Sequence, residues 1–327
     1  MEYRALGRTG LQVSALGFGC GAVGGLLVKG EYREMIRVIA RAIELGVTYF
    51  DTARVYGNGK SEDSLGRCLS ELGSEVVVGT KVQIQPDEID RIEKAVVASV
   101  EGSLLRLRMD CVDLIQLHNR VKKTRHPDQG WLGVAEVEKV LQAFEKLQQQ
   151  GKVKHWGING LGNTGTLHRI VAHGHAETIQ CCYNLINPSA GIKMPPEFPF
   201  QNYDCLIDAA AQQHMGVIAI RVLAAGALSG ATGKHPNAAP NVAPIATNAS
   251  YEEDVIYAQN FNFLVEQGIT SSLVEAAIRF SISNPAISTT LVGISNMEQL
   301  EQAVEAANTG SLPLEIIPGL SEIWNSG

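Results

Sequence analysis

Four polar side chains of this sequence could transfer a proton if the fold brought them together: Asp51, Tyr56, Lys81 and His118. Three of them follow short apolar runs that are typical of buried parallel strands, at 47–50, 76–80 and 112–117. The carboxyl ends of the strands in an α/β barrel form a single rim, where catalytic side chains gather. We therefore expect an acid, a phenol, an amine and an imidazole to converge on one spot.

The tyrosine is the natural proton carrier of such a group. A phenol with a pKa of about 10 is a poor acid or base near neutral pH, and an adjacent ammonium group lowers that pKa. We expect Lys81 to lower the pKa of Tyr56 and Asp51 to hold Lys81 in place. His118 would then orient or polarise a carbonyl oxygen beside Tyr56. The alternative is structural, with an Asp51–Lys81 ion pair and a packed tyrosine.

Strand-like and helix-like segments alternate along the chain. A small hairpin is predicted over 5–13, around Arg8-Thr9-Gly10. Eight strands are predicted, at 15–19, 47–50, 76–80, 112–117, 153–158, 178–183, 217–222 and 287–292. An open doubly wound sheet would need a GxGxxG fingerprint, which Gly17-Phe18-Gly19-Cys20-Gly21 does not match. The sequence therefore predicts an α/β protein, a (β/α)8 TIM barrel with a short N-terminal β-hairpin, as one domain over 1–327.

Helix boundaries are indicated by local signals. Apolar residues at helical spacing predict a helix over 34–45, which Gly46 would end. Ser61 is a candidate N-cap for the next helix, and Pro86 suits the first turn of a later one. A further helix is expected over 134–150, before Gly151.

Composition excludes several classes of protein. The chain has 327 residues, 45% of them hydrophobic, and a formal net charge of −7, which disfavours binding to nucleic acid. We expect no signal peptide and no membrane-spanning segment, because no apolar run is long enough. Its six cysteines lack metal-site spacing. We therefore expect a cytoplasmic enzyme that acts on a small molecule.

Five ordered blocks of this chain resemble the aldo-keto reductases. They are Tyr3 to Gly19, Phe50 to Glu62, Asp113 to His118, Gly151 to Gly157 and Gln180 to Leu185. The resemblance implies an NAD(P)-dependent oxidoreductase on a (β/α)8 barrel. Its reaction would transfer a hydride between NADP(H) or NAD(H) and a small aldehyde, ketone or sugar, with Tyr56 as the general acid or base.

The same resemblance implies a set of cofactor contacts. The amide of the nicotinamide would be held by Asn159 and Gln180, although the family's Ser-Asn pair is Asn159-Gly160 here. The family's stacking aromatic is matched by Ile220. Further contacts are expected along the phosphates and the adenosine, from Arg221, Leu223, Gly226, Gly293, Ser295, Asn296 and Gln299. Because Gln299 replaces a common arginine, we expect only a modest preference for NADP over NAD.

Three other features have functional interpretations. The basic run from Arg120 to His126 is more typical of a solvated loop than of an anion-binding lid. The long segments 188–202 and 231–248 are expected to be substrate walls or partly disordered flaps. His173-Gly174-His175 lacks a third ligand, so we expect no metal.

Two rival functions remain open. One is a lyase on the same barrel that uses Lys81 as a Schiff-base amine. The other is a non-catalytic subunit that senses nicotinamide cofactors and retains all four polar residues.

Overall fold

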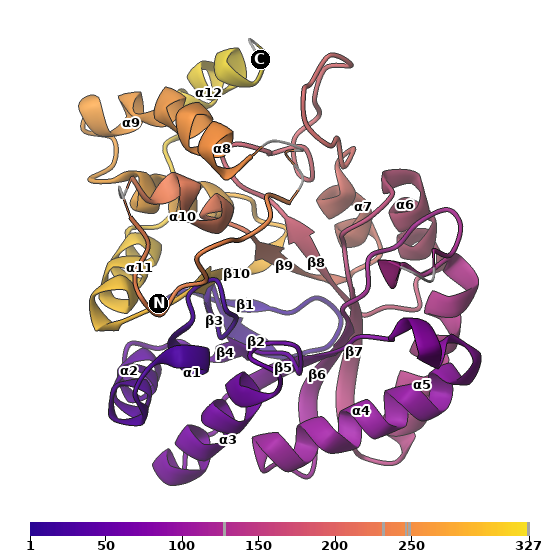
Figure 1. Ribbon diagram of the computed structural model, residues 1–327. Coiled ribbons are helices and arrows are strands. Elements are labelled where there is room, and N and C mark those ends of the chain that lie inside the picture. The colour runs from indigo at the N-terminus through magenta and orange to yellow at the C-terminus, as the bar shows by residue number, and fades with distance from the viewer. Residues whose placement is uncertain (127–128, 231–232, 246, 248–249, 326–327) are drawn as a thin grey trace.

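A closed barrel of eight parallel strands forms the centre of the computed structural model, which describes residues 1–126, 129–230, 233–245, 247 and 250–325 (Figure 1). In order around the barrel, the strands are β10 (Ile287–Gly293), β3 (Leu16–Gly19), β4 (Tyr49–Asp51), β5 (Val77–Val82), β6 (Val112–Leu117), β7 (Val153–Asn159), β8 (Thr178–Cys182) and β9 (Gly216–Ile220). Every neighbouring pair is parallel, so all eight strands end at the same rim.

Helices surround the barrel (Figure 1). The outer ring is made by α2 (Tyr32–Glu44), α3 (Lys60–Leu72), α4 (Ile92–Leu107), α5 (Val134–Gln149), α6 (Thr164–His173), α7 (Leu206–Gln212), α10 (Leu273–Ile282) and α11 (Met297–Thr309). Helix α2 illustrates the pattern, because Met35, Val38, Ile39 and Ala42 recur at helical spacing and all four are buried.

Shorter elements complete the connections. They are α1 (Leu26–Lys29), α8 (Tyr251–Ala258), α9 (Phe263–Glu266), α12 (Ile317–Asn325) and the 3-10 turns η1 (Pro86–Arg91), η3 (Ala224–Ser229), η4 (Gln259–Phe261) and η5 (Leu314–Ile316).

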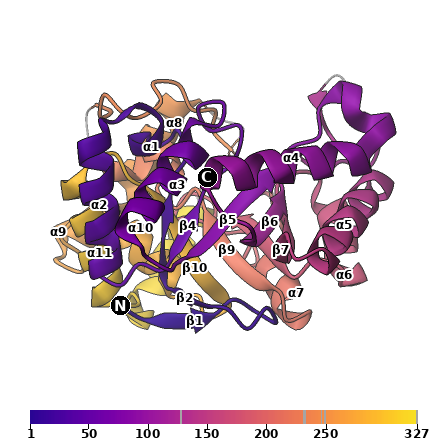
Figure 2. The ribbon, with the colours of Figure 1, turned by 90° about the horizontal axis from the view of Figure 1, so that it is seen from below.

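A hairpin closes the amino end of the barrel. Strands β1 (Tyr3–Ala5) and β2 (Gln12–Ser14) pair antiparallel. The hairpin lies at one end of the barrel, and α1 and α8 lie at the other (Figure 2). Leu6 and Val13 from the hairpin region are fully buried against an apolar layer inside the barrel, which consists of Tyr49, Leu114, Ile218 and Leu291. The barrel is therefore a packed core with one accessible end.

The predicted barrel and hairpin are confirmed, and three local predictions are corrected. Ser61 is not an N-cap: Gly59 holds that position, and the Ser61 hydroxyl donates to the Cys20 carbonyl at 2.8 Å. Pro86 begins the turn η1, so the long helix itself starts at Ile92. Strand β9 ends at Ile220, because Arg221 has a left-handed φ of 59° that breaks the extended run.

Three further predictions concern the cysteines, metal sites and membrane-spanning segments. All six cysteines are free, and Cys181 and Cys182 are both buried. No group of three metal-ligating side chains occurs among the described residues. His173 and His175 instead contact Glu138, at 3.2 and 2.7 Å. None of the described helices has the length and apolarity to cross a membrane.

Candidate active site

The four polar residues expected to act together do meet at the rim. Asp51 is the last residue of β4, Lys81 lies in β5, and His118 follows β6. The Lys81 ammonium forms an ion pair with Asp51 and donates to the Thr52 carbonyl at 2.8 Å and to the Tyr56 hydroxyl at 3.3 Å. Lys81 thus links the carboxylate to the phenol.

Asp51 is held by two further donors. The Tyr49 hydroxyl donates to Asp51 Oδ2 at 3.1 Å, and Gln180 Nε2 donates to the same oxygen at 2.7 Å. Gly79 lies directly opposite the Tyr49 hydroxyl, where a β-carbon would overlap it. These contacts fix the carboxylate within a buried environment, where charge-assisted hydrogen bonds are strong.

Burial and charge set the protonation states of Lys81 and Tyr56. Burial alone would lower the pKa of Lys81, but Asp51 and Tyr56 together raise it above its usual value. For Tyr56, burial raises the pKa more than the Lys81 charge lowers it. The prediction of a lowered pKa for Tyr56 is therefore wrong in net direction, although Lys81 acts in the expected sense.

His118 is a neutral imidazole. Burial, with the Lys81 charge acting in the same direction, lowers the pKa of His118 to about 3. Its ring meets the Tyr56 ring edge-on, with centroids 5.7 Å apart and planes at 88°. A neutral imidazole beside the phenol can orient an oxygen atom without competing for its proton.

A cavity of about 600 Å³ opens above these residues. Its lining runs from Asp51, Tyr56 and His118 at one end to Ser295 and Gln299 at the other. Most of the predicted cofactor contacts line it, namely Asn159, Gln180, Arg221, Leu223, Gly226, Gly293, Ser295 and Gln299. Asn296 does not. A cavity of this volume lies in the range typical of small-molecule and cofactor sites.

The two amides predicted to hold a nicotinamide already have partners inside the protein. Asn159 Nδ2 donates to the His118 carbonyl at 2.9 Å, and its Oδ1 accepts from the Leu161 amide at 2.9 Å. Gln180 uses its Nε2 for Asp51, which leaves its oxygen as the group available to a ligand's amide.

The far end of the cavity is built by the start of α11. Asn296 is the N-cap, and its Oδ1 accepts from the Gln299 amide at 2.9 Å. The side-chain oxygen of Gln299 in turn accepts a hydrogen bond from the Ser295 amide, also at 2.9 Å. These bonds place Asn296 in a capping role and hold Gln299 in one orientation.

The sequence did not predict which part of the long 231–248 segment matters. Residues 233–245 form a strap that lies along the cavity, while its flanking positions 231, 232, 246 and 248 lie outside the described residues. The Ala239 amide donates to the Ala22 carbonyl at 2.9 Å, and Asn237 Nδ2 donates to the Ser295 carbonyl at 3.0 Å. The strap therefore joins the β3 loop to the β10 loop.

Lys234 and His235 of the strap line the cavity, and sequence reasoning missed both. The only signal in the sequence was two basic residues in a segment without periodicity. Segment 188–202, the other predicted wall, contributes no lining residue to this cavity.

The basic run that follows β6 is partly ordered by its own contacts. Lys122 lies over the Trp131 ring at 4.2 Å, and the rings of His126 and Trp131 are 5.7 Å apart. Arg120 is exposed, and no residue of the run lines the main cavity. The loop is therefore mostly solvated, as its charge predicts.

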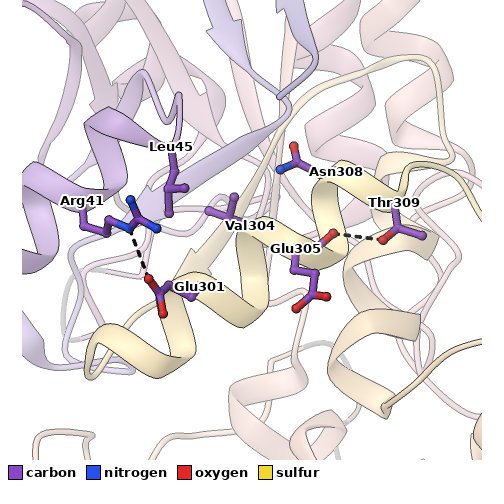
Figure 3. Close-up of a pocket in the computed structure, with 7 residues that line it drawn as sticks. All are labelled: Arg41, Leu45, Glu301, Val304, Glu305, Asn308 and Thr309. Carbon is purple, nitrogen blue, oxygen red and sulfur yellow. Dashed lines mark hydrogen bonds and ion pairs between the residues drawn. The ribbon is translucent and has the colours of Figure 1, made fainter.

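A shallower hollow of about 440 Å³ lies between α2 and α11, away from the rim (Figure 3). Arg41 from α2 pairs with Glu301 at 3.2 Å across it. Thr309 donates to the Glu305 carbonyl at 3.0 Å. Its charged pair is exposed to solvent, so no chemistry is assigned to this hollow.

The chain is similar to known proteins over nearly its whole length. The aldo/keto reductase family model matches residues 15–325. L-galactose dehydrogenase of Arabidopsis thaliana is 29% identical over 314 residues, which are 94% of this chain and 88% of that protein. A Schizosaccharomyces pombe protein named for a role as voltage-gated potassium channel subunit beta is 29% identical, over 99% of this chain and 94% of its own.

Among solved structures, an aldo-keto reductase from Bacillus halodurans in its holo form superposes with a TM-score of 0.72. The sequences are 22% identical, and the match covers 99% of this chain and 96% of the other. At that identity the likeness establishes the barrel fold.

Proposed function

Because the chain belongs to the aldo/keto reductase family, a family of oxidoreductases, we propose that it transfers a hydride between NADP(H) or NAD(H) and a small carbonyl compound. The substrate class is an aldehyde, a ketone or a sugar, interconverted with its alcohol. The name of the Arabidopsis relative supports the sugar option. The single observation that carries the proposal is the Lys81 ammonium held between the Asp51 carboxylate and the Tyr56 hydroxyl.

The nicotinamide cofactor supplies the hydride when it is bound. The oxygen of Gln180 would accept from its amide group, and Asn159 borders the same place. Leu223 and Gly226 would lie along its phosphates. The Ser295–Gln299 segment would receive the adenosine end, where Gln299 offers a neutral donor and the start of α11 adds a favourable dipole.

Tyr56 would donate a proton to the carbonyl oxygen as negative charge develops there. Its raised pKa keeps the phenol protonated near neutral pH, which suits the direction of reduction. Lys81 lowers the energy of the tyrosinate that remains, and Asp51 holds Lys81 in the ionised form. His118, neutral and edge-on to Tyr56, would orient the same oxygen.

The rival lyase is disfavoured by the state of Lys81. A Schiff-base lysine must be a free amine, so its pKa is ordinarily lowered. The pKa of Lys81 is raised, and its ammonium already has three partners.

The non-catalytic alternative is favoured by one observation, the likeness to the fission yeast channel subunit. Such a subunit would bind the cofactor without appreciable turnover. The assembled proton-transfer group favours catalysis over this role.

Three measurements on the intact protein separate these functions. Fluorescence titration with NADPH and NADH measures cofactor binding, and a screen of aldehydes, ketones and sugars under the tighter-binding cofactor measures turnover. Binding with turnover supports the proposal, whereas binding without turnover supports the sensing subunit. Trapping of a substrate on Lys81 by borohydride, without nicotinamide binding, supports the lyase.

A further inference from the structure

Arg221 occupies a strained position between β9 and η3. Its φ of 59° lies in the left-handed region, which is costly for a residue with a β-carbon. The backbone is held there by its carbonyl, which accepts from Asn184 Nδ2 at 2.9 Å and from the Ala224 amide at 2.8 Å. These two bonds hold the Arg221 backbone in its left-handed conformation at the end of β9.

The guanidinium of Arg221 is short of partners. It is partly buried and lines the same cavity as Tyr56 and His118. One of its nitrogens donates to the Ala243 carbonyl of the strap at 3.4 Å, a long bond. No carboxylate among the described residues pairs with it. A guanidinium has five donors in a planar fork that matches carboxylate and phosphate oxygens.

Its charged and titratable neighbours also lack a compensating anion. Those close enough to influence Arg221 are the Cys182 thiol, the Tyr56 phenol and the Arg120 guanidinium. Burial lowers the pKa of Arg221, and Arg120 acts in the same direction. Arg221 and the neutral His118 imidazole both line the reacting end of the cavity, where the Asp51 carboxylate is already paired with Lys81. A partly desolvated cation such as Arg221 is stabilised by an anionic ligand.

We propose that Arg221 is a substrate-binding residue, and that the carbonyl substrate carries a carboxylate or phosphate group that it holds beside Tyr56. Arg120, on the loop after His118, reinforces the positive potential at the mouth without lining the cavity. This inference rests on the proposed function, because it names the substrate class of the same site.

The phosphates of the cofactor are the alternative anionic partner for the Arg221 guanidinium. In the proposed function the phosphates lie along Leu223 and Gly226, and the adenosine end is bordered by Lys234, Ser295 and Gln299. Arg221 lines the same cavity as Tyr56, and its charge acts to lower the pKa of Tyr56, the group that would protonate the carbonyl. We therefore expect loss of its charge to affect substrates more than cofactor.

Matched substrate pairs test the inference. Glycolaldehyde phosphate is compared with glycolaldehyde, and succinic semialdehyde with butanal, in the wild type and in Arg221→Gln. Losing a charge-assisted hydrogen bond should lower kcat/KM about 10- to 100-fold for the charged member of a pair. The uncharged member should change less than about threefold. The phosphate and carboxylate pairs show which anion the site prefers.

Three controls make the result specific. Arg54→Gln removes an exposed arginine of the same rim that does not line the cavity, and should change neither pair. Arg221→Lys, which keeps the positive charge, should retain part of the preference for charged over uncharged substrates. NADPH and NADH affinities, measured by fluorescence, should stay within about threefold of wild type in Arg221→Gln.

Two results would overturn the inference. One is an equal loss of kcat/KM for charged and uncharged partners, and the other is a loss of NADPH affinity without a change in substrate preference. If the wild type reduces no carbonyl at all, the proposed function fails, and the anion site is then tested alone by calorimetry. Inorganic phosphate and acetate should bind the wild type, and equal binding by Arg221→Gln would reject the site.

Discussion

The ammonium nitrogen of Lys81 lies 3.3 Å from the Tyr56 hydroxyl and 4.9 Å from the centre of its ring. A positive charge at that distance stabilises the tyrosinate far more than it affects the neutral phenol. Burial acts in the opposite sense and dominates, so the phenol stays protonated until a reaction withdraws its proton. The site therefore holds a proton donor with a nearby charge that acts on its conjugate base.

Replacing Tyr56 by phenylalanine should abolish most turnover and leave cofactor binding intact. The variant keeps the ring that packs against His118 and removes the hydroxyl, which carries the transferable proton and accepts from Lys81. General acid–base catalysis contributes roughly 10²- to 10⁴-fold, so kcat should fall by at least that factor. Steady-state kinetics and NADPH titration of the same sample measure both effects. Near-normal turnover would remove Tyr56 from the mechanism.

Replacing Lys81 by methionine should change the pH dependence of alcohol oxidation. Oxidation needs the tyrosinate, and losing the neighbouring charge raises the pKa of Tyr56 further, so the rising limb of kcat/KM should move to higher pH. Lys60→Met, an exposed change on the same rim, is the control.

Lys81→Met also leaves the Asp51 charge buried without its ion pair, which typically costs about 3–5 kcal/mol. The double variant Asp51→Asn/Lys81→Met removes both charges and separates loss of fold from loss of chemistry. An unshifted profile in a folded Lys81→Met protein would make Lys81 purely structural.

Carbonyl reduction should be nearly independent of pH from about pH 5 to about pH 9. His118, with its pKa lowered to about 3, is neutral throughout that interval. Tyr56, with its pKa raised, is protonated throughout it, so activity is present below the tyrosine pKa and lost only above it. The profile of kcat/KM checks this, with activity remeasured at neutral pH after each exposure. A limb near pH 6.5 would show that His118 titrates normally.

Gln299→Arg should strengthen NADPH binding and leave NADH binding nearly unchanged. A guanidinium pairs with a 2′-phosphate better than a neutral amide does. The affinities of the wild type for NADPH and NADH should therefore differ by no more than about two orders of magnitude, or roughly 3 kcal/mol. Arginine cannot accept from the Ser295 amide, so a small loss of stability should accompany the gain.

Asn308→Arg adds the same charge near the other end of α11 and should affect neither cofactor. A much larger difference between the NADPH and NADH affinities of the wild type would show that the 2′-phosphate binds elsewhere. An unchanged NADPH affinity in Gln299→Arg would show the same.

Asp254→Asn should stabilise the protein at neutral pH. Asp254 is 3% exposed, one of its oxygens has no partner, and the other accepts from Thr247 at 3.4 Å. Burial raises its pKa to about 6, so folding favours the protonated acid. The free energy of unfolding of the wild type thus falls as the pH rises from about 4 through about 6. Above that range the Asp254→Asn variant should be more stable than the wild type by about 1–2 kcal/mol.

Denaturation at pH 4 and at pH 7.5 tests this, because the advantage of the variant should vanish at the lower value. An equal difference at both values would show that the carboxyl does not titrate in this interval.

The barrel and the four polar residues were predictable because both follow from local patterns. Apolar runs fixed the strands, and the position of Asp51 and His118 at strand ends fixed the rim. The net pKa of Tyr56 was not predictable, because burial is a property of the whole fold. Nor was the place of Lys234 and His235, which depends on how an aperiodic strap crosses the cavity.

Some predicted contacts proved to have internal partners that no motif reveals. Asn159 was expected to face a cofactor, yet both ends of its amide bond to the protein backbone. Gln299 was expected to be a phosphate ligand and is also part of a helix cap. A sequence motif records which side chain stands at a position, and it does not record how many of its hydrogen bonds are already used.

The hairpin beneath the barrel has a consequence for water. Leu6 and Val13, with the apolar layer that contains Tyr49 and Leu114, seal the end of the barrel below Asp51. Among the described residues this end of the barrel is closed, so solvent would reach the reacting groups through the mouth, which substrate and cofactor would fill in the proposed function. In that reaction each proton given up by Tyr56 would be replaced after the product departs. Tyr56 should then be reprotonated once per cycle and shielded from bulk water in between.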